Sequence, residues 1–265
     1  MLDQVTPLVL TFNEEPNIRR TLNSLTWANS ILVIDSFSSD ETVGVAEEFP
    51  NASVTQRSFD THTTQWNFGL DQVPTPWVLS LDADYELSQG LIDEIKRLTP
   101  SNEISGYAAR FEFRIFGHPL RASVYPPRIV LFRKDKGRYV EDGHTQLLRI
   151  DGQIEELKSV IIHDDRKPLS RWIQSQDSYM KIEALHLLAT PNSQLSLQDR
   201  LRKKIFLAPP IMFLYLLFVR GLILDGWPGW YYVKQRTLAE MLLSLRLLTE
   251  REGLETKRNN LKSDG

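Results

Sequence analysis

The feature that most limits how this chain can fold is a short apolar run that ends in two carboxylates. The run Trp77–Leu81 has the length of a buried β-strand, and Asp82-Ala83-Asp84 follows it directly. Because side chains alternate along a strand, the two aspartates lie on one side of the chain with Ala83 opposite. Such a pair suits a hard divalent cation, Mg²⁺ or Mn²⁺, whose remaining ligands are often substrate phosphates. An Asp-x-Asp on its own is more often a loop or a helix cap, so the rest of the chain has to decide.

Strand-like runs and helices alternate before this point. The runs are Val5–Phe12, Ile31–Ile34 and, more weakly, Asn51–Arg57. Helices are predicted over the segment with Ile18, Leu22 and Leu25, over the segment that ends at Phe49, and over Thr61–Leu70. This alternation predicts a mostly parallel α/β sheet flanked by helices, with right-handed crossovers. Ligands of such sheets gather at the carboxyl ends of the strands, where Thr11, Asn13, Asp35 and the Asp82/Asp84 pair fall.

The pattern changes after a predicted helix at Ser88–Leu98. Gly106–Phe116 alternates aromatic and polar residues, and strand-like runs follow at Arg128–Arg133 and Leu157–Ile162. These runs predict antiparallel or mixed strands that extend the sheet. A long helix is expected over Leu169–Leu188, and Pro191 ends it. We therefore expect an α/β domain at residues 1–190 and a helical C-terminal region at residues 191–265.

Charge and cysteine content exclude several classes of function. The net charge is −3, from 31 basic and 34 acidic residues, so nothing in the overall charge attracts the protein to nucleic acid. The chain has no cysteine, which excludes disulfides and thiolate metal sites. The first residues lack the basic and apolar regions of a secretory signal, and we expect the catalytic part to stay in the cytoplasm.

The last third of the chain is unusually apolar. A basic stretch, Arg200–Lys204, is followed by the uncharged Ile205–Val219, which contains Pro209-Pro210. This segment is short for a spanning helix, which needs about 20 apolar residues. Trp227, Trp230 and a predicted helix at Leu238–Leu248 extend the apolar surface. Residues 200–250 therefore predict association with a membrane surface, interfacial or re-entrant, and the alternatives are a spanning segment or a buried contact in a homo-oligomer.

Four motifs in order resemble those of the family 2 glycosyltransferases of GT-A fold, in particular the branch with bacterial lipopolysaccharide-core glucosyltransferases. They are Thr11-Phe12-Asn13-Glu14-Glu15, Asp35-Ser36-Phe37-Ser38-Ser39-Asp40-Glu41-Thr42, Gln65-Trp66-Asn67-Phe68-Gly69-Leu70 and Leu81-Asp82-Ala83-Asp84. The resemblance covers roughly the first 190 residues. It implies a nucleotide-sugar donor, usually linked to uridine diphosphate, a divalent cation and inversion at the anomeric carbon. The acceptor would be a glycan or glycolipid, such as a lipid-linked glycan or lipopolysaccharide core, at the cytoplasmic face of the membrane.

Several residues receive candidate roles from this comparison and from their positions. Asp82 and Asp84 are expected at the metal, and His163 can complete its ligand shell. The residues expected at the nucleotide are Thr11, Asn13, Glu14, Asp35, Gln65, Asn67 and Asp82; the cations expected at the diphosphate are Arg166, Lys167 and Arg171. Simpler explanations exist: a helix N-terminus accounts for Glu14, a plain helix face accounts for Gln65 and Asn67, and a histidine at a strand end is often structural.

Two departures from the resemblance concern the chemistry. Trp66 stands where relatives usually carry Arg, so a cation expected near the donor is absent or comes from elsewhere. Gln146 stands where relatives place a Glu, and an amide cannot take a proton. A direct displacement needs a carboxylate that removes the proton of the acceptor hydroxyl, and Asp142 is the first choice and Glu141 the second. An acidic turn before a strand would explain both residues without catalysis.

Two other functions remain open from the sequence. A nucleotidyltransferase or sugar-phosphate transferase on a similar sheet would need a glycine-rich phosphate loop after the first strand, and residues 11–16 contain no glycine. A catalytically silent glycan-binding or scaffold protein is the second alternative, and Gln146 supports it best.

Overall fold

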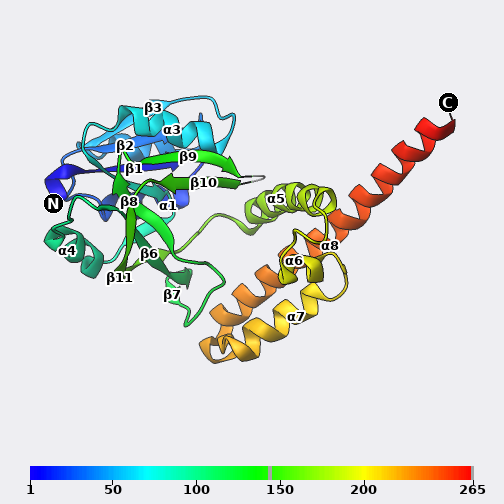
Figure 1. The fold of residues 1–265 in the computed structure, drawn as a ribbon. Helices are drawn as coiled ribbons and strands as arrows, with labels where there is room; N and C mark the ends of the chain where they lie inside the picture. The colour runs from blue at the N-terminus through cyan, green and yellow to red at the C-terminus, as the bar shows by residue number, and fades with distance from the viewer. Residues whose placement is uncertain (143–144, 264–265) are drawn as a thin grey trace. The chain divides into compact units, whose positions relative to one another are not determined.

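The computed structural model describes the backbone of residues 1–142 and 145–263, and the side chains of these residues except 142, 145, 146 and 254–263. The chain forms two compact units (Figure 1). The first comprises Met1–Pro119 and Ser123–Lys167, and the second comprises Leu120–Ala122 and Pro168–Gly265. The division therefore falls between Lys167 and Pro168, earlier in the chain than the boundary at residue 190 that the sequence suggests.

The first unit begins with the predicted alternation of strands and helices. In chain order the elements are β1 Val5–Thr11, α1 Glu15–Asn23, β2 Ile31–Asp35, α2 Thr42–Glu47, β3 Ala52–Gln56, α3 His62–Gln72 and β4 Trp77–Asp82. The four strands pair in parallel in the order β3-β2-β1-β4. Two helix ends differ from the prediction, because α1 stops before Leu25 and α2 stops before Phe49. Leu25 is nevertheless fully buried in the turn after α1.

The second half of the sheet is mixed, as the sequence predicts. Its elements are β5 Tyr85–Leu87, α4 Gln89–Arg97, β6 Ile104–Ile115, β7 His118–Pro119, β8 Arg128–Arg133 and β11 Gln153–His163. Strand β8 is antiparallel to both β4 and β6, whereas β11 runs parallel to β6 and antiparallel to β5. These strands continue the sheet in the order β4-β8-β6-β11-β5, with β7 paired to β6. The expected α/β sheet, parallel in its first half and mixed in its second, is confirmed.

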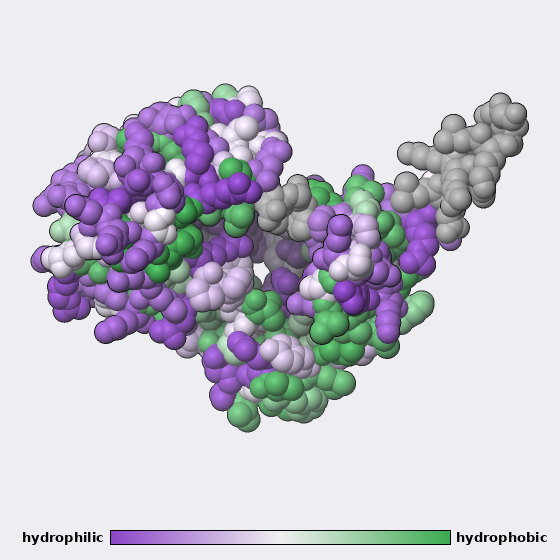
Figure 2. All heavy atoms as spheres, viewed as in Figure 1, coloured by the Kyte–Doolittle hydropathy of each residue, from purple (hydrophilic) through white to green (hydrophobic). Residues whose placement is uncertain are grey.

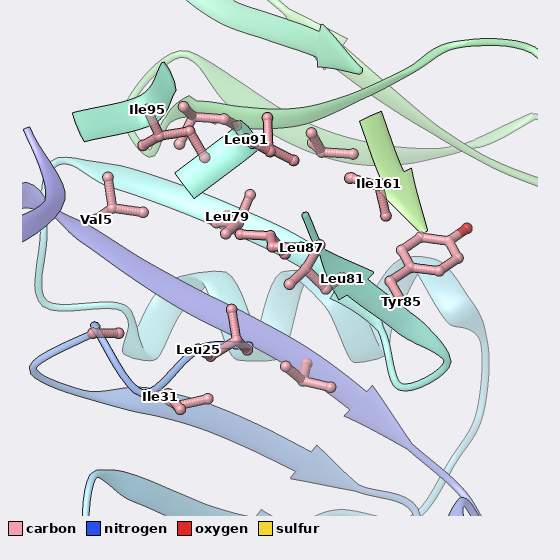
Figure 3. Close-up of a cluster of buried hydrophobic side chains, with 14 of the residues drawn as sticks. Val5, Leu25, Ile31, Leu79, Leu81, Tyr85, Leu87, Leu91, Ile95 and Ile161 are labelled. Carbon is pink, nitrogen blue, oxygen red and sulfur yellow. The ribbon is translucent and has the colours of Figure 1, made fainter. Parts of the chain in front are cut away.

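Apolar layers on both faces of the sheet explain the continuous apolar runs. On one face, Leu79 and Leu81 of β4 pack with Leu91 and Ile95 of α4, as Figure 3 shows. The other face carries Leu8, Ile34, Trp66 and Leu70 in a separate cluster with α3. Side chains cap the N-termini of α3 and α4: Thr61 accepts from Thr64 N at 3.2 Å, and Ser88 accepts from Leu91 N at 3.2 Å. Because both faces are covered, the strands need no polar alternation.

A two-stranded hairpin that the sequence did not predict lies beside α3. It consists of β9 Gly137–Asp142 and β10 Thr145–Ile150, which pair antiparallel. The ring of Tyr139 stacks on Trp66 with centroids 5.2 Å apart, and its hydroxyl donates to Ser80 Oγ at 3.1 Å. Asn67 fixes the strand further, because its side-chain amide donates to Tyr139 O at 2.9 Å and accepts from Tyr139 N at 3.1 Å.

The second unit is helical. Its elements are α5 Leu169–Ala189, α6 Leu197–Arg202, α7 Ala208–Leu214, the π-helical turn η2 Tyr215–Val219, the 3₁₀ turn η3 Leu222–Asp225 and α8 Gly226–Ser263. Helices α5 and α8 pack through Ala184, Leu187, Leu243 and Leu247. Pro209 and Pro210 start α7 rather than interrupt a longer helix, since proline at the first turn loses no hydrogen bond.

Among the residues that the structure describes, no single helix has the length and apolar character to cross a membrane. Ala208–Val219 and Leu222–Gly253, which are bent by 70° relative to each other, meet that test only as a pair.

Candidate active site

The loops after β1 and β2 are locked together at the carboxyl edge of the sheet. Asn13 N donates to Ser38 Oγ at 2.7 Å, and Asn13 Oδ1 accepts from Ser39 N at 2.6 Å. Asn13 and Phe37 both adopt positive φ angles, 53° and 58°, which asparagine tolerates and phenylalanine rarely adopts. Strand register places Thr11 beside Asp35 and Leu10 beside Asp82. The sequence prediction that these strand ends meet at one edge is therefore correct.

Asp35 shapes the loop that follows it. Its side chain is fully buried, and it accepts from Thr11 Oγ1 at 2.9 Å and from Gln56 Nε2 at 3.2 Å. Ser38 adds two more bonds, from its backbone N at 2.8 Å and its hydroxyl at 2.5 Å. Four protein donors thus occupy the carboxylate. Its expected contact with the donor's base stays a prediction.

The two amides of the Gln65-Trp66-Asn67 motif have separate environments. Gln65 is buried beside the ends of β2 and β3, where its Nε2 donates to Ser36 Oγ at 3.1 Å and its Oε1 accepts from Arg57 at 2.5 Å. Asn67 instead holds the backbone of Tyr139 in the hairpin, as described above. Trp66 is a core residue. Arg57 therefore brings a cation next to the motif that the sequence alone did not assign.

Asp84 and His163 meet although they are far apart in the chain. Pairing of β5 with β11 places His163 beside Tyr85, and His163 Nε2 lies 3.0 Å from Asp84 Oδ2. Asp84 Oδ1 and His163 Nδ1 are buried and have no partner among the described residues. Burial alone would raise the pKa of Asp84, but His163 and Lys167 outweigh it and lower that pKa to about 2. Burial and then the charge of Asp84 raise the pKa of Asp82.

Aromatic rings enclose His163. The ring of Phe113 is 4.2 Å away, that of Tyr85 5.2 Å and that of Tyr125 5.7 Å. The hydroxyls of Tyr85 and Tyr125 lie 2.8 Å apart, and the guanidinium of Arg128 lies over the Tyr125 ring at 4.3 Å. Sequence reasoning missed both tyrosines and Arg128. The available signal was the Tyr125-Pro126-Pro127-Arg128 run that leads into a predicted strand.

A buried network joins the first loop to the end of β11. Asn17 is fully buried on α1, and its amide donates to Glu14 Oε2 at 2.9 Å and to Asp165 Oδ1 at 3.0 Å. Its oxygen accepts from Arg166 N at 2.9 Å and from Arg20 Nη2 at 2.8 Å. Sequence reasoning missed this residue, because a single asparagine on a helix carries no distinctive pattern.

The network ends in an ion pair between Lys167 and Glu14. Their side-chain atoms Nζ and Oε1 are 2.8 Å apart. Burial raises the pKa of Glu14 to about 7, Lys167 opposes this rise, and Asp84 adds to it. Burial alone would lower the pKa of Lys167, but Glu14, Asp84 and Asp165 outweigh it and raise that pKa overall. Lys167 thus lies in the field of Asp84, and its contact with the diphosphate stays a prediction.

The other two expected diphosphate cations have different surroundings. Arg166 donates to Asp164 Oδ2 from Nε at 2.9 Å and from Nη2 at 2.7 Å. Arg171 lies in the first turn of α5, in the second unit. Their contacts with the diphosphate stay predictions.

The two candidate bases lie on β9. Glu141 is exposed, and strand alternation places it on the same side as Tyr139. The side chain of Asp142, which the sequence ranks first, lies outside the described side chains. The choice between them stays a prediction.

The acidic pair has the chemistry of a partial metal site. Within the described ranges, no group of three or more His, Asp or Glu side chains is arranged to hold a metal ion. Asp82 and Asp84 nevertheless offer carboxylate oxygens at one strand end, and the buried Asp84 Oδ1 has no hydrogen-bond partner among the residues that the structure describes. Magnesium and manganese take one or two carboxylates together with substrate phosphates, so these residues fit such an ion.

A mixed α/β sheet that brings an Asp-x-Asp pair to the carboxyl edge beside two polar loops is the arrangement of a GT-A glycosyltransferase. The family model described as Glycosyl transferase family 2 matches residues 8–150, and the chain belongs to this family.

Two curated relatives and one solved structure show the range of similarity. An uncharacterized glycosyltransferase of Rickettsia felis is 32% identical over 109 residues, which are 41% of this chain and only 38% of the relative. The lipopolysaccharide core biosynthesis glycosyltransferase LpsC of Rhizobium meliloti is 24% identical over 261 residues, 95% of this chain and 94% of LpsC. The crystal structure of S. aureus TarS 1-349 in complex with UDP-GlcNAc has 14% identity and a TM-score of 0.48, and it covers 94% of this chain and 92% of that one.

Proposed function

We propose that this chain transfers a sugar, with inversion, from a uridine diphosphate donor to a lipid-linked glycan or lipopolysaccharide core at the cytoplasmic face of the membrane. Membership of family 2 supports glycosyl transfer, and similarity to LpsC over 95% of this chain supports the acceptor class. The observation that carries the proposal is the convergence of Asp82, Asp84, Lys167 and the loops after β1 and β2 at one edge of the sheet.

The donor is held from two sides of this edge. Asp82 and Asp84 would hold the divalent cation, and within the described part of the chain Asp84 Oδ1 has no hydrogen-bond partner. When bound, Mg²⁺ or Mn²⁺ supplies positive charge that neutralises the diphosphate of the donor. Lys167, which has a raised pKa and therefore stays charged at neutral pH, adds a fixed cation next to Asp84.

The acceptor hydroxyl needs a base on the other side of the sugar. We assign this role to Asp142, with Glu141 second, because Gln146 cannot accept the proton. Asp142→Asn and Glu141→Gln separate the two in a transfer assay. We expect the variant that lacks the base to lose about 10²–10⁴ in rate. Transfer at the wild-type rate in both variants would contradict the assignment.

The membrane contact is assigned to an apolar elbow, residues 206–230, which comprises α7, η2, η3 and the start of α8. Phe206, Phe218, Val219 and Leu224 are between 61% and 77% exposed, while Leu216 and Leu222 are buried inside the unit. Figure 2 shows apolar surface gathered over this part of the second unit. An apolar surface of this kind costs free energy in water, and a bilayer interface removes it.

Charge around the elbow favours an anionic lipid surface. Lys204, Arg220 and Lys234 are exposed beside or within it, and each basic residue near an anionic surface adds about 1 kcal/mol of attraction. Trp227, 54% exposed, suits the depth of the headgroups. The 70° bend between the two apolar helices suits an interfacial elbow better than a straight span.

Vesicle sedimentation tests the elbow. Phe218→Glu with Leu224→Glu should reduce binding to anionic vesicles by about tenfold or more, because two charges enter the apolar face. Leu197→Glu is the matched control, since Leu197 is 83% exposed but lies outside the elbow. Equal sedimentation of the double variant and the wild type contradicts the membrane assignment. If the elbow instead joins copies of the chain, light scattering will show that the double variant loses an oligomer.

The donor assignment has its own test. Uridine, guanosine, adenosine and cytidine diphosphates are compared by thermal shift of the wild type, with and without Mn²⁺. We expect uridine diphosphate to stabilise the protein in a metal-dependent manner, by about 2.7 kcal/mol at a concentration 100 times its Kd. If none of the four raises the melting temperature, the transferase proposal fails and a scaffold function gains support.

A further inference from the structure

Arg128 begins β8, the strand that pairs with the strand ending in Asp82. Strands β4 and β8 pair antiparallel with Trp77 beside Arg133 and Leu79 beside Leu131. Beyond these pairs, Ser80 Oγ still reaches the neighbouring strand and donates to Val130 O at 3.4 Å. Asp82, the last residue of β4, lies two residues beyond Ser80, and Arg128, the first residue of β8, lies two residues before Val130, so the two residues are at neighbouring strand ends.

Arg128 does not use Asp82 as a hydrogen-bonding partner. Its guanidinium forms no salt bridge or hydrogen bond with any residue that the structure describes, and its side chain is exposed. It rests instead on the ring of Tyr125, 4.3 Å from the centroid. A guanidinium carries five N–H donors, and stacking on a ring leaves the donors at its edge available.

The Tyr125 ring is a fixed support. Its hydroxyl is 2.8 Å from that of Tyr85, and its ring packs on Phe111 at 5.0 Å and Phe113 at 5.3 Å. Pro126 and Pro127 connect it to Arg128 and restrict the backbone between the two residues. The guanidinium is therefore held in place before any ligand arrives.

The charges around Asp82 and Asp84 indicate which kind of ligand Arg128 binds. Two carboxylates repel an anion, and neighbouring cations offset this repulsion. Lys167 acts on the Asp84 side, and the charge of Arg128 acts on Asp82. An arginine can bind two phosphate oxygens at once, which a lysine cannot do.

We propose that Arg128 binds a phosphate of the donor's diphosphate and that Tyr125 is the residue that positions it. This inference rests on the proposed function. It adds a specific anion-binding residue that is not among the cations expected at the diphosphate from the sequence.

Calorimetric titration of the full chain with uridine diphosphate, uridine monophosphate and uridine, in the presence of Mn²⁺, tests the proposal. Arg128→Gln should weaken the binding of uridine diphosphate about ten- to hundredfold. It should weaken the binding of uridine less than about twofold, because only uridine diphosphate carries the diphosphate. Arg128→Lys should fall between the wild type and Arg128→Gln, since it keeps the charge and loses the fork.

The support is tested by two substitutions at Tyr125. Tyr125→Phe keeps the ring and should retain most of the affinity for uridine diphosphate. Tyr125→Leu removes the ring and should weaken the binding of uridine diphosphate without weakening the binding of uridine. Arg133→Gln is the matched control, because Arg133 lies at the other end of β8 and also stacks on a ring, that of Trp77 at 4.7 Å. It should bind all three ligands like the wild type.

The outcomes separate this inference from the proposed function. If the wild type binds none of the three ligands, the proposed function fails. If the wild type binds uridine diphosphate and Arg128→Gln binds it equally well, this inference alone is wrong. It is equally wrong if Arg128→Gln weakens uridine as much as uridine diphosphate, since the change is then not at the phosphate.

Discussion

Asn17 is the residue whose replacement tests most directly how the site is held together. Its side chain is fully buried and makes four hydrogen bonds, to Glu14, Asp165, Arg166 and Arg20. Two of them are donated to carboxylates, and two are accepted from an N–H of an arginine residue. One amide thus joins the loop after β1 to the segment that follows β11.

The loss of stability in Asn17→Ala depends on which partners of Asn17 keep another hydrogen bond. Glu14 keeps Lys167 at 2.8 Å, and Asp165 keeps Lys167 N at 3.0 Å. Arg166 N has no second partner among the described residues. An unsatisfied buried group costs about 1–3 kcal/mol, and the lost bonds to charged groups add to this, so we expect about 3 kcal/mol in total. For a chain of this size, that corresponds to a decrease of about 6–12 °C in the melting temperature.

Asn17→Asp should behave differently, because it replaces the N–H donors with a carboxylate oxygen that faces the carboxylate oxygens of Glu14 and Asp165. The new acid would lie between Glu14 and Asp165, which raises its folded pKa above that in the unfolded chain. As the pH rises, the unfolded chain releases this proton first, so stability is lost from about pH 4 up to the folded pKa. The deficit of Asn17→Asp should therefore grow between pH 5 and pH 8, while that of Asn17→Ala changes much less.

Differential scanning calorimetry at pH 5, 6, 7 and 8 measures both variants. Asn23→Asp is the control, because Asn23 is exposed on the same helix and its replacement introduces the same charge. It should stay within about 0.5 kcal/mol of the wild type at every pH. Two results would contradict the role of this network. One is that Asn17→Ala also stays within about 0.5 kcal/mol of the stability of the wild type. The other is that the loss of stability of Asn17→Asp is no larger at pH 8 than at pH 5.

Three further predictions follow from the first unit. Asp84→Asn should lower transfer by at least about a hundredfold and abolish the Mn²⁺-dependent thermal shift, and a variant that keeps both contradicts the metal assignment. The pKa of Glu14 is raised to about 7, so the folded state should lose stability as the pH rises from about 4.5 through 7. Glu14→Gln should flatten this loss in denaturant titrations. Gly69→Ala should cost about 1–3 kcal/mol, measured by urea unfolding, because a Cβ there would lie 2.6 Å from Leu8 Cδ1.

The parallel half of the sheet could be predicted because its strands are buried on both faces. Such strands appear in the sequence as short continuous apolar runs, and Ile31–Asp35 and Trp77–Asp82 are clear cases. The polar residues at their ends then had to lie at one edge, so Thr11, Asp35 and Asp82 could be grouped without coordinates. The same logic placed His163 at a strand end. It could not show that β11 returns beside β5 and brings His163 to Asp84.

The β9–β10 hairpin could not be predicted in the same way. Its contacts are made with α3, through the stack of Tyr139 on Trp66 and the bonds of Asn67 to the Tyr139 backbone. These are tertiary contacts between segments about 70 residues apart, and periodicity within β9 does not contain them. For the same reason the sequence assigned Asn67 to the nucleotide, although both ends of its amide bind the backbone of the hairpin.

In the charged run from His163 to Lys167, not every cation is available to a ligand, because some pair with acidic residues of the protein. Arg166 donates twice to Asp164, and Arg20 donates to the same residue. The sequence predicts that Arg166 contacts the diphosphate, but its positive charge is largely neutralised by Asp164 within the protein. Lys167 differs, because its partner Glu14 has a pKa of about 7 and the field of Asp84 also acts on it. Only the contacts distinguish the two cations, and they make Lys167 the stronger candidate to meet an incoming phosphate.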